Sequence, residues 1–370
     1  MENKFPDSWK EVELGEICEI KRGSSITKKT ITEGDIPVIA GGQKPAYYHN
    51  LPNRTGETLT VSGSGAYAGF VAYFNIPIFA SDCSTIQAKS KDILMRYAYY
   101  FLKRNQKQIY EMQKGIAQPH VYPKDLAIMK VPLPPLQIQK QIVKTLEGAE
   151  RLKQKREDAD KLTKEYLQGV FYEMFLNKGF EERRLGEICD KITDGTHVTP
   201  KYMDKGIPFL RVTDLTESNT SKKFISKEEH KQLIKRCFPE RGDILYTKNG
   251  TIGIAKAINW DYEFSIFVSL CLIKPKKNLI LSKYLEFFLN TPYALRQAVS
   301  HSKKGTIINL HLIEIKKIKI PLPALSLQNQ FASIVEEVEK LKQKQKQSKE
   351  EINQMFDSLM KQAFNGELIK

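Results

Sequence analysis

The chain has 370 residues, of which 41% are hydrophobic, and Lys and Arg outnumber Asp and Glu by 58 to 43. This length favours two or three domains, each with enough apolar residues for a packed core. The net charge of +15 favours a polyanionic partner, most simply nucleic acid. The five cysteines form no C-x-x-C pair, no apolar run reaches the ~18 residues of a membrane span, and Met1–Lys10 lacks the apolar core of a signal peptide. We therefore expect a soluble, cytoplasmic protein without disulfides, structural zinc or contact with a membrane.

Two motifs each occur twice in the chain. Leu14–Cys18 (Leu-Gly-Glu-Ile-Cys) returns as Leu185–Cys189, and Val131–Gln139, which contains Pro-Leu-Pro, returns as Ile320–Gln328. A charged helical pattern follows each Pro-Leu-Pro. A period of roughly 180 residues is too long for a solenoid, whose repeats span about 20–50 residues. The pattern predicts two tandem copies of a globular module followed by a long helix.

The first module reads as a mixture of strands and helices. Ile36–Ala40, Thr58–Val61 and Gly69–Phe74 are rich in β-branched and aromatic residues, which favour strands. A helical pattern follows at Ile93–Met112, and Leu126–Pro132 reads as a closing strand.

The second module repeats this plan. Gly206–Val212 and Gly242–Thr247 match the first two strands, Ser282–Ala298 matches the helix, and Ile315–Pro321 is the predicted closing strand. We therefore predict an α+β fold, with mixed α/β as the alternative, in two tandem modules. The predicted domains are 1–134 (first module), 135–177 (first long helix), 178–323 (second module) and 324–370 (second long helix).

The two long helices carry a heptad pattern. Spacings of three and four residues alternate without a break from Phe331 to Leu359, with polar Gln345 and Ser348 in the middle, and the first helix has the same polar centre. This shared pattern predicts an antiparallel intramolecular coiled coil. The alternative is that each helix packs only on its own module. The predicted contact residues are Ile142, Ala149, Leu152, Tyr166, Val170, Phe331, Ile334, Val338, Leu341, Ile352, Met355 and Leu359.

The sequence carries no complete catalytic motif. It has no P-loop and no Asn/Asp-Pro-Pro-aromatic motif of amino-methyltransferases, and its six histidines form no ligand cluster. Asp82 with Gln87–Lys89 resembles a nuclease carboxylate-x-lysine arrangement but supplies only one carboxylate, and Gly63–Gly65 reads as a tight turn. We predict no catalytic residue, no metal ligand and no cofactor bound by this chain.

Polar loops occur at matching places in both modules. Hydroxyl, amide and basic side chains suit contacts with phosphates and base edges, whereas a single loop of this kind is more often only a solvated turn. By sequence, Ser62 and Ser64 align with Lys248 and Asn249. The candidate DNA-contacting residues are Lys21, Arg22, Ser24, Gln43, Lys44, Tyr47, Tyr48, Ser62, Ser64, Tyr67, Lys114, Gln118 and His120 in the first module, and Thr196, His197, Thr199, Lys201, Tyr202, Arg211, Lys248, Asn249, Thr251, Lys304 and Asn309 in the second.

These motifs, in this order and duplicated, resemble the specificity (S) subunit of type I restriction-modification systems over the whole chain. The resemblance rests on both Leu-Gly-Glu-Ile starts, Asp194–His197 with Gly206–Arg211, Gly242–Leu245, the two Pro-Leu-Pro entries into helices and the ending Gln362–Leu368. The first module departs from the pattern, because Lys21–Ser25 replaces the Asp-Gly-Thr-His loop.

The resemblance implies a function. Each module would read one half of a bipartite, asymmetric DNA target, and the coiled coil would fix the gap between the halves. The subunit would not be catalytic. It would recruit methyltransferase (M) subunits, two of them, and restriction (R) motor subunits, which would bind S-adenosylmethionine, ATP and Mg²⁺.

Two other functions remain open from the residues alone. One is a self-contained DNA methyltransferase or nuclease, which requires a cofactor site that the motifs do not supply. The other is a coiled-coil scaffold whose globular ends bind proteins, which the net charge of +15 disfavours.

Overall fold

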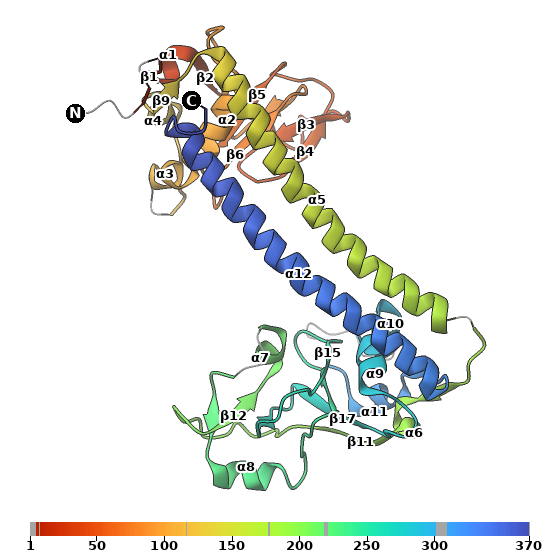
Figure 1. Cartoon of the computed structure of the whole chain (residues 1–370). Coiled ribbons are helices and arrows are strands. Elements are labelled where there is room, and N and C mark those ends of the chain that lie inside the picture. Colours follow the sequence, from red (N-terminus) through yellow and green to blue (C-terminus); the bar gives the residue numbers. More distant parts are fainter. Residues whose placement is uncertain are drawn as a thin grey trace. The chain divides into compact units, whose positions relative to one another are not determined.

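The chain divides into two compact units. The computed structural model describes residues 5–6, 8–115, 117–176, 178–217, 221–300 and 309–369. Unit 1 comprises Met1–Asp158 with Lys346–Lys370, and unit 2 comprises Ala159–Gln345. Each unit holds one globular module and one half of each of the two long helices, α5 (Leu136–Phe175) and α12 (Leu325–Phe364) (Figure 1). The boundary between the units therefore falls inside both helices.

The first module is built on three small sheets. A four-stranded antiparallel sheet has the order β2-β8-β5-β6, a three-stranded sheet has the order β4-β3-β7, and β1 pairs with β9. The central strand β5 is buried along its whole length, as its run Thr-Leu-Thr-Val-Ser suggests. The bounds are β1 Lys10–Glu13, β2 Cys18–Arg22, β3 Ile36–Ile39, β4 Tyr47–His49, β5 Thr58–Ser62, β6 Val71–Phe74, β7 Phe79–Ala80, β8 Cys83–Ala88 and β9 Lys130–Leu133.

The second module has the same three sheets in the same arrangement. Its sheets have the orders β11-β17-β14-β15, β13-β12-β16 and β10-β18. In both modules the three-stranded sheet contains one parallel pair, β3 with β7 and β12 with β16. The bounds are β10 Glu182–Arg184, β11 Cys189–Asp194, β12 Ile207–Leu210, β13 Phe224–Ile225, β14 Ile244–Thr247, β15 Ala255–Ala257, β16 Ser265–Ile266, β17 Leu270–Pro275 and β18 Lys319–Pro321.

The shorter helices complete each module. The predicted α+β class with two tandem modules is confirmed, but the predicted helices Ile93–Met112 and Ser282–Ala298 are each split in two, and each predicted closing strand begins with a short helix. The bounds are α1 Leu14–Ile17, α2 Met95–Arg104, α3 Gln106–Glu111, α4 Pro123–Ala127, α6 Leu185–Ile188, α7 Val212–Glu217, α8 Lys227–Leu233, α9 Ser282–Leu289, α10 Pro292–Ser300 and α11 Leu312–Lys317.

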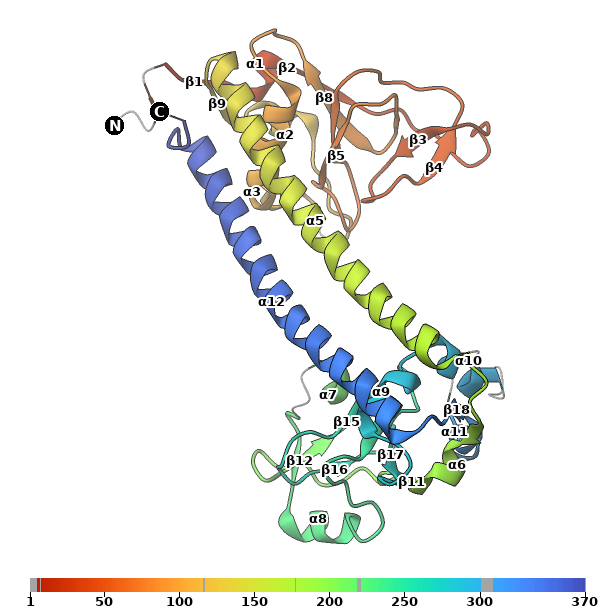
Figure 2. The same cartoon turned by 45° about the vertical axis from the view of Figure 1, so that its right-hand side comes forward.

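Within unit 1, the first half of α5 packs against the last half of α12. Lys153 Nζ lies 4.8 Å from the ring centroid of Phe356, and Lys349 Nζ lies 4.0 Å from Glu157 Oε1. As residue numbers rise along α5 they fall along α12, so the helices are antiparallel, as Figure 2 also shows. Ile142 of α5 and Phe364 of α12 are buried in the core of the first module.

Within unit 2, the second half of α5 packs against the first half of α12. Gln345 Nε2 donates a hydrogen bond of 2.8 Å to Thr163 Oγ1, and the rings of Phe171 and Phe331 lie 5.3 Å apart. The pairing is again antiparallel, so the predicted intramolecular coiled coil is confirmed. Each helix end also enters the core of its module, so the two packing schemes considered from the sequence occur together.

The contact face of the helices differs in part from the predicted seam. Ile142, Ala149, Phe331 and Val338 are buried, and Ile334, Ile352, Leu359 and Val170 are partly buried. By contrast, four predicted contact residues are exposed: Leu152 (48%), Tyr166 (59%), Leu341 (46%) and Met355 (38%). For three of them the inward position lies one residue later, at Lys153, Leu167 and Phe356.

Gly169, in the last two turns of α5, is expected to weaken the helix without serving its packing. Gly169 is exposed, and a methyl group added at its Cα would have no other heavy atom within 4 Å. We expect Gly169→Ala to raise the free energy of unfolding by about 0.5–1 kcal/mol, because alanine loses less backbone entropy on folding. Urea unfolding measures this change. A decrease in stability would mean that the position contacts a neighbour absent from this packing.

Candidate nucleic-acid interface

The two modules hold their first polar loops with the same backbone hydrogen bonds. Ser24 N donates to Ala80 O over 2.9 Å, and Thr196 N donates to Ile266 O over 3.1 Å. In each case the preceding glycine, Gly23 or Gly195, comes directly after the first strand of the four-stranded sheet. The loops Lys21–Ser25 and Asp194–Tyr202 are therefore structurally equivalent, although their sequences differ.

Gly195 is required by close backbone packing. A methyl group at this position would lie 2.0 Å from Ile266 O, and one at Gly23 would lie 2.1 Å from Ser81 O. We expect Gly195→Ala to lower the stability of unit 2 by about 1–3 kcal/mol, since the neighbouring strand must move to make room. Gly250→Ala is the control for placing a methyl group in open space, although its φ of +77° adds strain of its own. A Gly195→Ala protein as stable as wild type would contradict this packing.

In the first module, several candidates gather around the turn that follows β5. Ser64 pairs with His120 in an isolated antiparallel bridge, and Lys114 pairs with the same His120. Gln118 Nε2 lies 3.4 Å from Ser64 Oγ, and Ser64 Oγ in turn donates to the carboxylate of Asp82. Asp82 therefore orients the turn through a hydrogen bond.

A second loop of the first module lies against the same turn. A Cβ atom added at Gly41 would lie 2.6 Å from Ser64 O, so the segment around Gly41 packs against the Ser64 turn. Gln43 and Lys44 come two and three residues later and therefore lie near this turn. Tyr48 is 57% exposed on β4, the next strand. Polar and aromatic side chains from separate segments thus share one end of this module.

The second module brings a comparable set together. Asn249 pairs with Asn309 in an isolated antiparallel bridge, as Ser64 pairs with His120. Thr196 pairs with Phe267, and its Oγ1 accepts a hydrogen bond of 3.1 Å from Val198 N. The loops after β11 and β14 therefore lie at the same end of the second module.

A buried carboxylate organises this end of the second module. Asp194 is 4% exposed, and its Oδ2 lies 3.3 Å from Lys248 Nζ and 3.3 Å from His197 Nε2. Its Oδ1 accepts a hydrogen bond of 2.5 Å from Arg236 Nη2. The Arg236 and His197 side chains are 57% and 60% exposed, so the carboxylate anchors a guanidinium and an imidazole that face solvent.

The sequence alignment of the modules is correct at one position and shifted at another. Ser64 and Asn249 are equivalent, because both form the bridge described above. Lys248, however, is equivalent to Gly63 and not to Ser62: Gly63 O accepts from Val121 N, and Lys248 O accepts from Leu310 N. The strand before this turn contains no insertion. The sequence alignment is shifted by one residue because Gly63 lies between small polar residues, which give no side-chain pattern that would fix the alignment.

The other candidates differ in accessibility. Ser62 is 3% exposed and Lys248 is 5% exposed, so in this structure both serve packing, Lys248 as the partner of Asp194. Lys304 lies outside the described residues. The remaining candidates are exposed or partly exposed: Lys21, Arg22, Ser24, Gln43, Lys44, Tyr47, Tyr48, Ser64, Tyr67, Lys114, Gln118 and His120, and Thr196, His197, Thr199, Lys201, Tyr202, Arg211, Asn249, Thr251 and Asn309.

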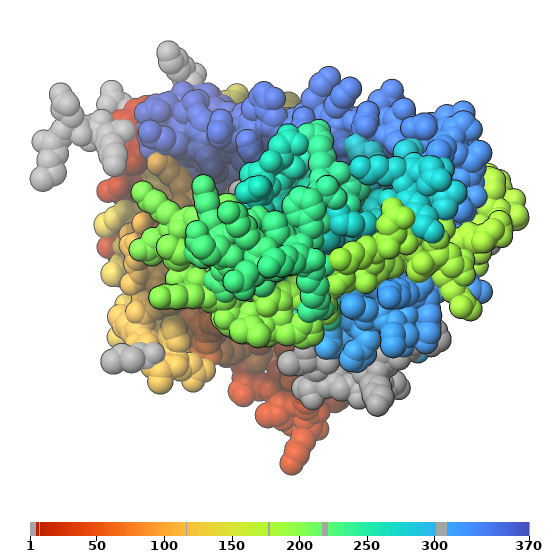
Figure 3. Space-filling view, turned by 90° about the horizontal axis from the view of Figure 1, so that it is seen from below, coloured from red at the N-terminus to blue at the C-terminus, as the bar shows by residue number. Residues whose placement is uncertain are grey.

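Several exposed candidates are held by neighbours. Lys114 Nζ binds both oxygens of Asp125 at 2.8 Å, and Arg211 Nε lies 3.4 Å from Asp214 Oδ2. Lys223 Nζ lies 5.0 Å from the ring centroid of Tyr202. Figure 3 views the molecule from below, where the green segment that contains α8 is exposed in unit 2. Arg236, which follows α8, was not among the sequence candidates, because a basic residue in a loop carries no distinguishing pattern.

The cysteines and the possible metal ligands of the described residues do not form a cluster. All five cysteines are buried and unpaired with one another, and burial raises the pKa of Cys18 and Cys83 to about 12, so these thiols stay protonated near neutral pH. Within the described ranges, no group of three or more His, Cys, Asp or Glu side chains could hold a metal ion. Neither long helix, nor any other helix in the described part of the chain, carries an apolar stretch of the length that a bilayer requires.

Comparison with known proteins places both modules in one family. The family model for the type I restriction modification DNA specificity domain matches twice, at residues 6–159 and 177–354. The chain belongs to this family. The resemblance inferred from the repeated motifs is thereby confirmed, and each match covers one specificity domain together with part of the long helix that follows it.

Curated relatives of these specificity domains align over nearly the whole chain. The chain is 21% identical to the type I restriction enzyme EcoBI specificity subunit of Escherichia coli, with 98% of this chain and 86% of the relative covered. It is 22% identical to the type I restriction enzyme MjaVIII specificity subunit of Methanocaldococcus jannaschii, with 99% and 94% covered.

Solved structures share the fold. The S subunit of a type I restriction-modification system from M. genitalium matches with a TM-score of 0.59 and 18% identity, covering 98% of this chain and 97% of that one. A chain from a structure of complex assembly and conformational transition of the type I R-M system matches with a TM-score of 0.65 and 20% identity, covering 98% and 99%.

Proposed function

We propose that this chain is the DNA-sequence specificity subunit of a type I restriction-modification complex. Each module would read one half of a bipartite target, and the paired helices would fix the gap between the halves. The observation that carries the proposal is the duplicated specificity domain, in which equivalent loops present different side chains. Because Lys21–Ser25 and Asp194–Tyr202 differ in sequence, the two half-sites are expected to differ.

Non-specific DNA binding should depend strongly on salt. With a net charge of +15 and about 6–10 phosphate contacts, we expect the affinity for duplex DNA to fall by roughly 10³–10⁵ between 50 and 200 mM salt. Fluorescence anisotropy of a labelled duplex across this range measures the slope. A flat profile would contradict binding through the phosphate backbone.

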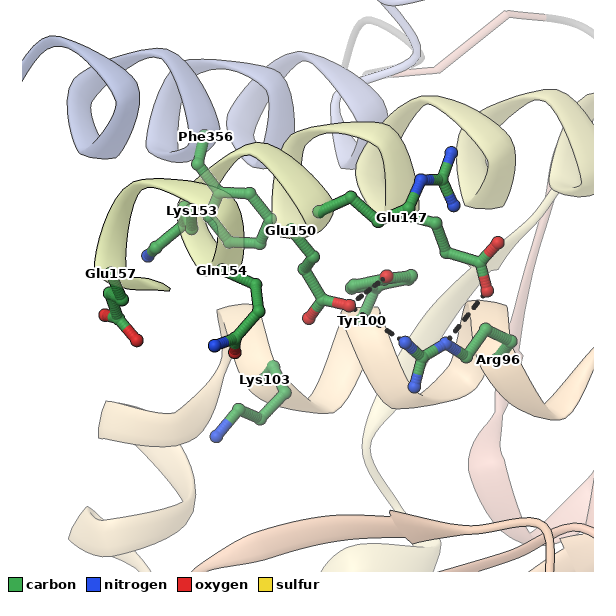
Figure 4. Close-up of a pocket in the computed structure, with 10 residues that line it drawn as sticks. Arg96, Tyr100, Lys103, Glu147, Glu150, Lys153, Gln154, Glu157 and Phe356 are labelled. Atoms are coloured by element: carbon green, nitrogen blue, oxygen red, sulfur yellow. Dashed lines mark hydrogen bonds and ion pairs between the residues drawn. The ribbon is translucent and has the colours of Figure 1, made fainter. Parts of the chain in front are cut away.

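Two equivalent pockets support the recruitment of two methyltransferase subunits. In unit 1 a pocket of about 650 Å³ lies beside Arg96, which pairs with Glu147 and Glu150 of α5 at 3.2 and 2.8 Å (Figure 4). In unit 2 a pocket of about 230 Å³ lies beside Lys283, which pairs with Glu336 and Glu339 of α12 at 3.5 and 3.1 Å. A chain with two like surfaces can bind two copies of one partner.

Exposed apolar side chains on the helices favour the same partners. Leu152 and Met355 in unit 1, and Leu162, Tyr166 and Leu341 in unit 2, are each at least 38% exposed. Solvent-facing apolar residues concentrated on paired helices are typical of protein–protein interfaces. We assign these positions to contacts with methyltransferase subunits. The restriction subunits would then bind to the methyltransferase subunits.

In this proposal the chain itself is not an enzyme. The methyltransferase and restriction subunits would hold S-adenosylmethionine, ATP and Mg²⁺, while this chain supplies sequence recognition. The missing amino-methyltransferase motif supports this division of labour.

The test is a map of modified adenines in host DNA, with and without this gene. A split motif that disappears on deletion and returns on complementation is the expected result. Exchanging residues 178–323 for the second module of a relative should then change one half of the motif and leave the other half unchanged. An unaltered adenine map on deletion would reject the assignment, and binding of S-adenosylmethionine by the isolated chain would favour a self-contained methyltransferase.

A further inference from the structure

The cation cluster around Asp194 has the features of a base-reading device. We propose that Arg236 reads a guanine in the half-site of the second module, and that Asp194 is a positioning residue that holds the Arg236 guanidinium in place. This inference rests on the proposed function and adds a specific contact to it.

The charge balance of the cluster argues against a purely structural ion pair. Buried Lys248, with its Nζ 3.3 Å from Asp194 Oδ2, already neutralises the single carboxylate. Arg236 therefore adds a net positive charge, and it does so with a side chain that is 57% exposed. A cluster that keeps an excess cation at the surface, next to the Thr196–Tyr202 loop, suits a polyanionic ligand.

The geometry of the Arg236 guanidinium suits a bidentate contact with a base edge. Asp194 takes one hydrogen bond, from Nη2 of Arg236, and no other side-chain hydrogen bond of this guanidinium is found in the described part of the chain. The second Nη2–H, the Nε–H and the Nη1–H groups remain available. The second Nη2–H points parallel to either the Nε–H or an Nη1–H, and this pair forms a planar fork of two donors. A planar pair of donors matches guanine O6 and N7 in the major groove, and fixing the fork in advance reduces the entropy lost on binding.

The first module does not have this device. Arg22 occupies the position of Asp194, directly before the glycine, and Gly63 occupies the position of Lys248. Loss of the Asp194–Arg236 pair should therefore affect one half-site only, which provides an internal control within every DNA molecule.

The experiment uses the specificity subunit assembled with its methyltransferase subunits and a library of duplexes. One library is randomised over the half-site that the module exchange assigns to residues 178–323, and another over the other half-site. For wild type we expect a preference for guanine at one position of the first library. Arg236→Ala should reduce this preference by about 10–100-fold, the discrimination that one bidentate base contact provides.

Further variants separate reading from positioning. Arg236→Lys keeps the charge but not the fork, so the preference should still be lost. Asp194→Asn alone should weaken the preference for guanine. The double variant Asp194→Asn/Arg236→Ala should show the same preference as Arg236→Ala alone. Arg241→Ala is the control, because Arg241 is 64% exposed and paired with Asp261 in the same module. Since Asp194→Asn leaves Lys248 buried without its partner, melting curves must first show that it folds, and the Arg236 variants test the proposal without it.

Three outcomes would overturn this inference. An unchanged preference in Arg236→Ala would remove Arg236 as a reader, and an equal loss over both half-sites would assign it to general charge or folding. A full preference in folded Asp194→Asn would remove the positioning role. If wild type selects no sequence in either library, the proposed function fails, which distinguishes that failure from failure of the Arg236 assignment.

Discussion

Phe331→Ala is expected to lower the free energy of unfolding of unit 2 by about 3–5 kcal/mol. Phe331 is fully buried at the start of α12, and its ring lies 4.9–5.4 Å from the rings of Phe171, Phe175 and Phe287. Removing it leaves a cavity among rings that cannot collapse, since each already packs on the others. It would loosen both the helix pair and the module that this pair enters.

The two tryptophans allow this effect to be followed unit by unit. Trp9 lies in unit 1 and Trp260 in unit 2, and they are the only tryptophans of the chain. In a Trp9→Phe background, Trp260 fluorescence during urea unfolding should report the loss. Leu341→Ala is the control on the same helix, because Leu341 is 46% exposed and should cost less than about 0.5 kcal/mol. Equal losses for both variants would restore the seam predicted from the heptad pattern.

Gln139→Leu is expected to destabilise unit 1 by about 3–5 kcal/mol, because it breaks one buried and two partly buried hydrogen bonds to backbone groups. Gln139 is fully buried; its Nε2 donates to Pro134 O and Asp92 O, and its Oε1 accepts from Leu94 N, at 2.7–2.9 Å. This amide joins the beginning of α5 to the segment before α2. Leucine has a similar volume but can form none of these bonds.

The second unit repeats the arrangement and supplies a matched variant. Gln328 donates to Pro323 O and Leu279 O and accepts from Leu281 N, at 2.9–3.0 Å. Gln328→Leu should lower the stability of unit 2 by a similar amount, read from Trp260, while Gln139→Leu acts on unit 1, read from Trp9 in a Trp260→Phe background. Gln137→Leu should have little effect on stability, because Gln137 is exposed although it lies only two residues before Gln139. Small losses in both buried variants would show that water replaces the amides.

Much of the architecture could be predicted because the sequence contains the same set of motifs twice. The Leu-Gly-Glu-Ile and Pro-Leu-Pro motifs mark the beginning of each module and of each helix, and the helices are long enough for their period to dominate. Even buried Gln139 and Gln328 stand at matching places in the repeated motif. The exact seam was less predictable, since Leu152 and Leu341 are apolar but exposed, whereas Lys153 is partly buried and its Nζ lies over the ring of Phe356.

The candidate site was predictable as a set of loops but not residue by residue. Equivalent loops follow equivalent strands, so their location follows from the repeat. Lys248 is buried because Asp194, far away in sequence, lies next to it, and Arg236 gains its place from the same carboxylate. Such long-range ion pairs depend on tertiary packing and leave no local pattern.

Unit 1 is made from two segments of chain that are far apart, and this has a consequence for the order in which the protein forms during translation. Met360, Ala363 and Phe364 complete the core of the first module, yet the ribosome makes them after the whole of unit 2. At about 5–20 residues per second, the first module waits roughly 10–40 s for them. During this time its apolar face is uncovered, and a chaperone or a partner subunit that shields the face would raise the yield of folded protein.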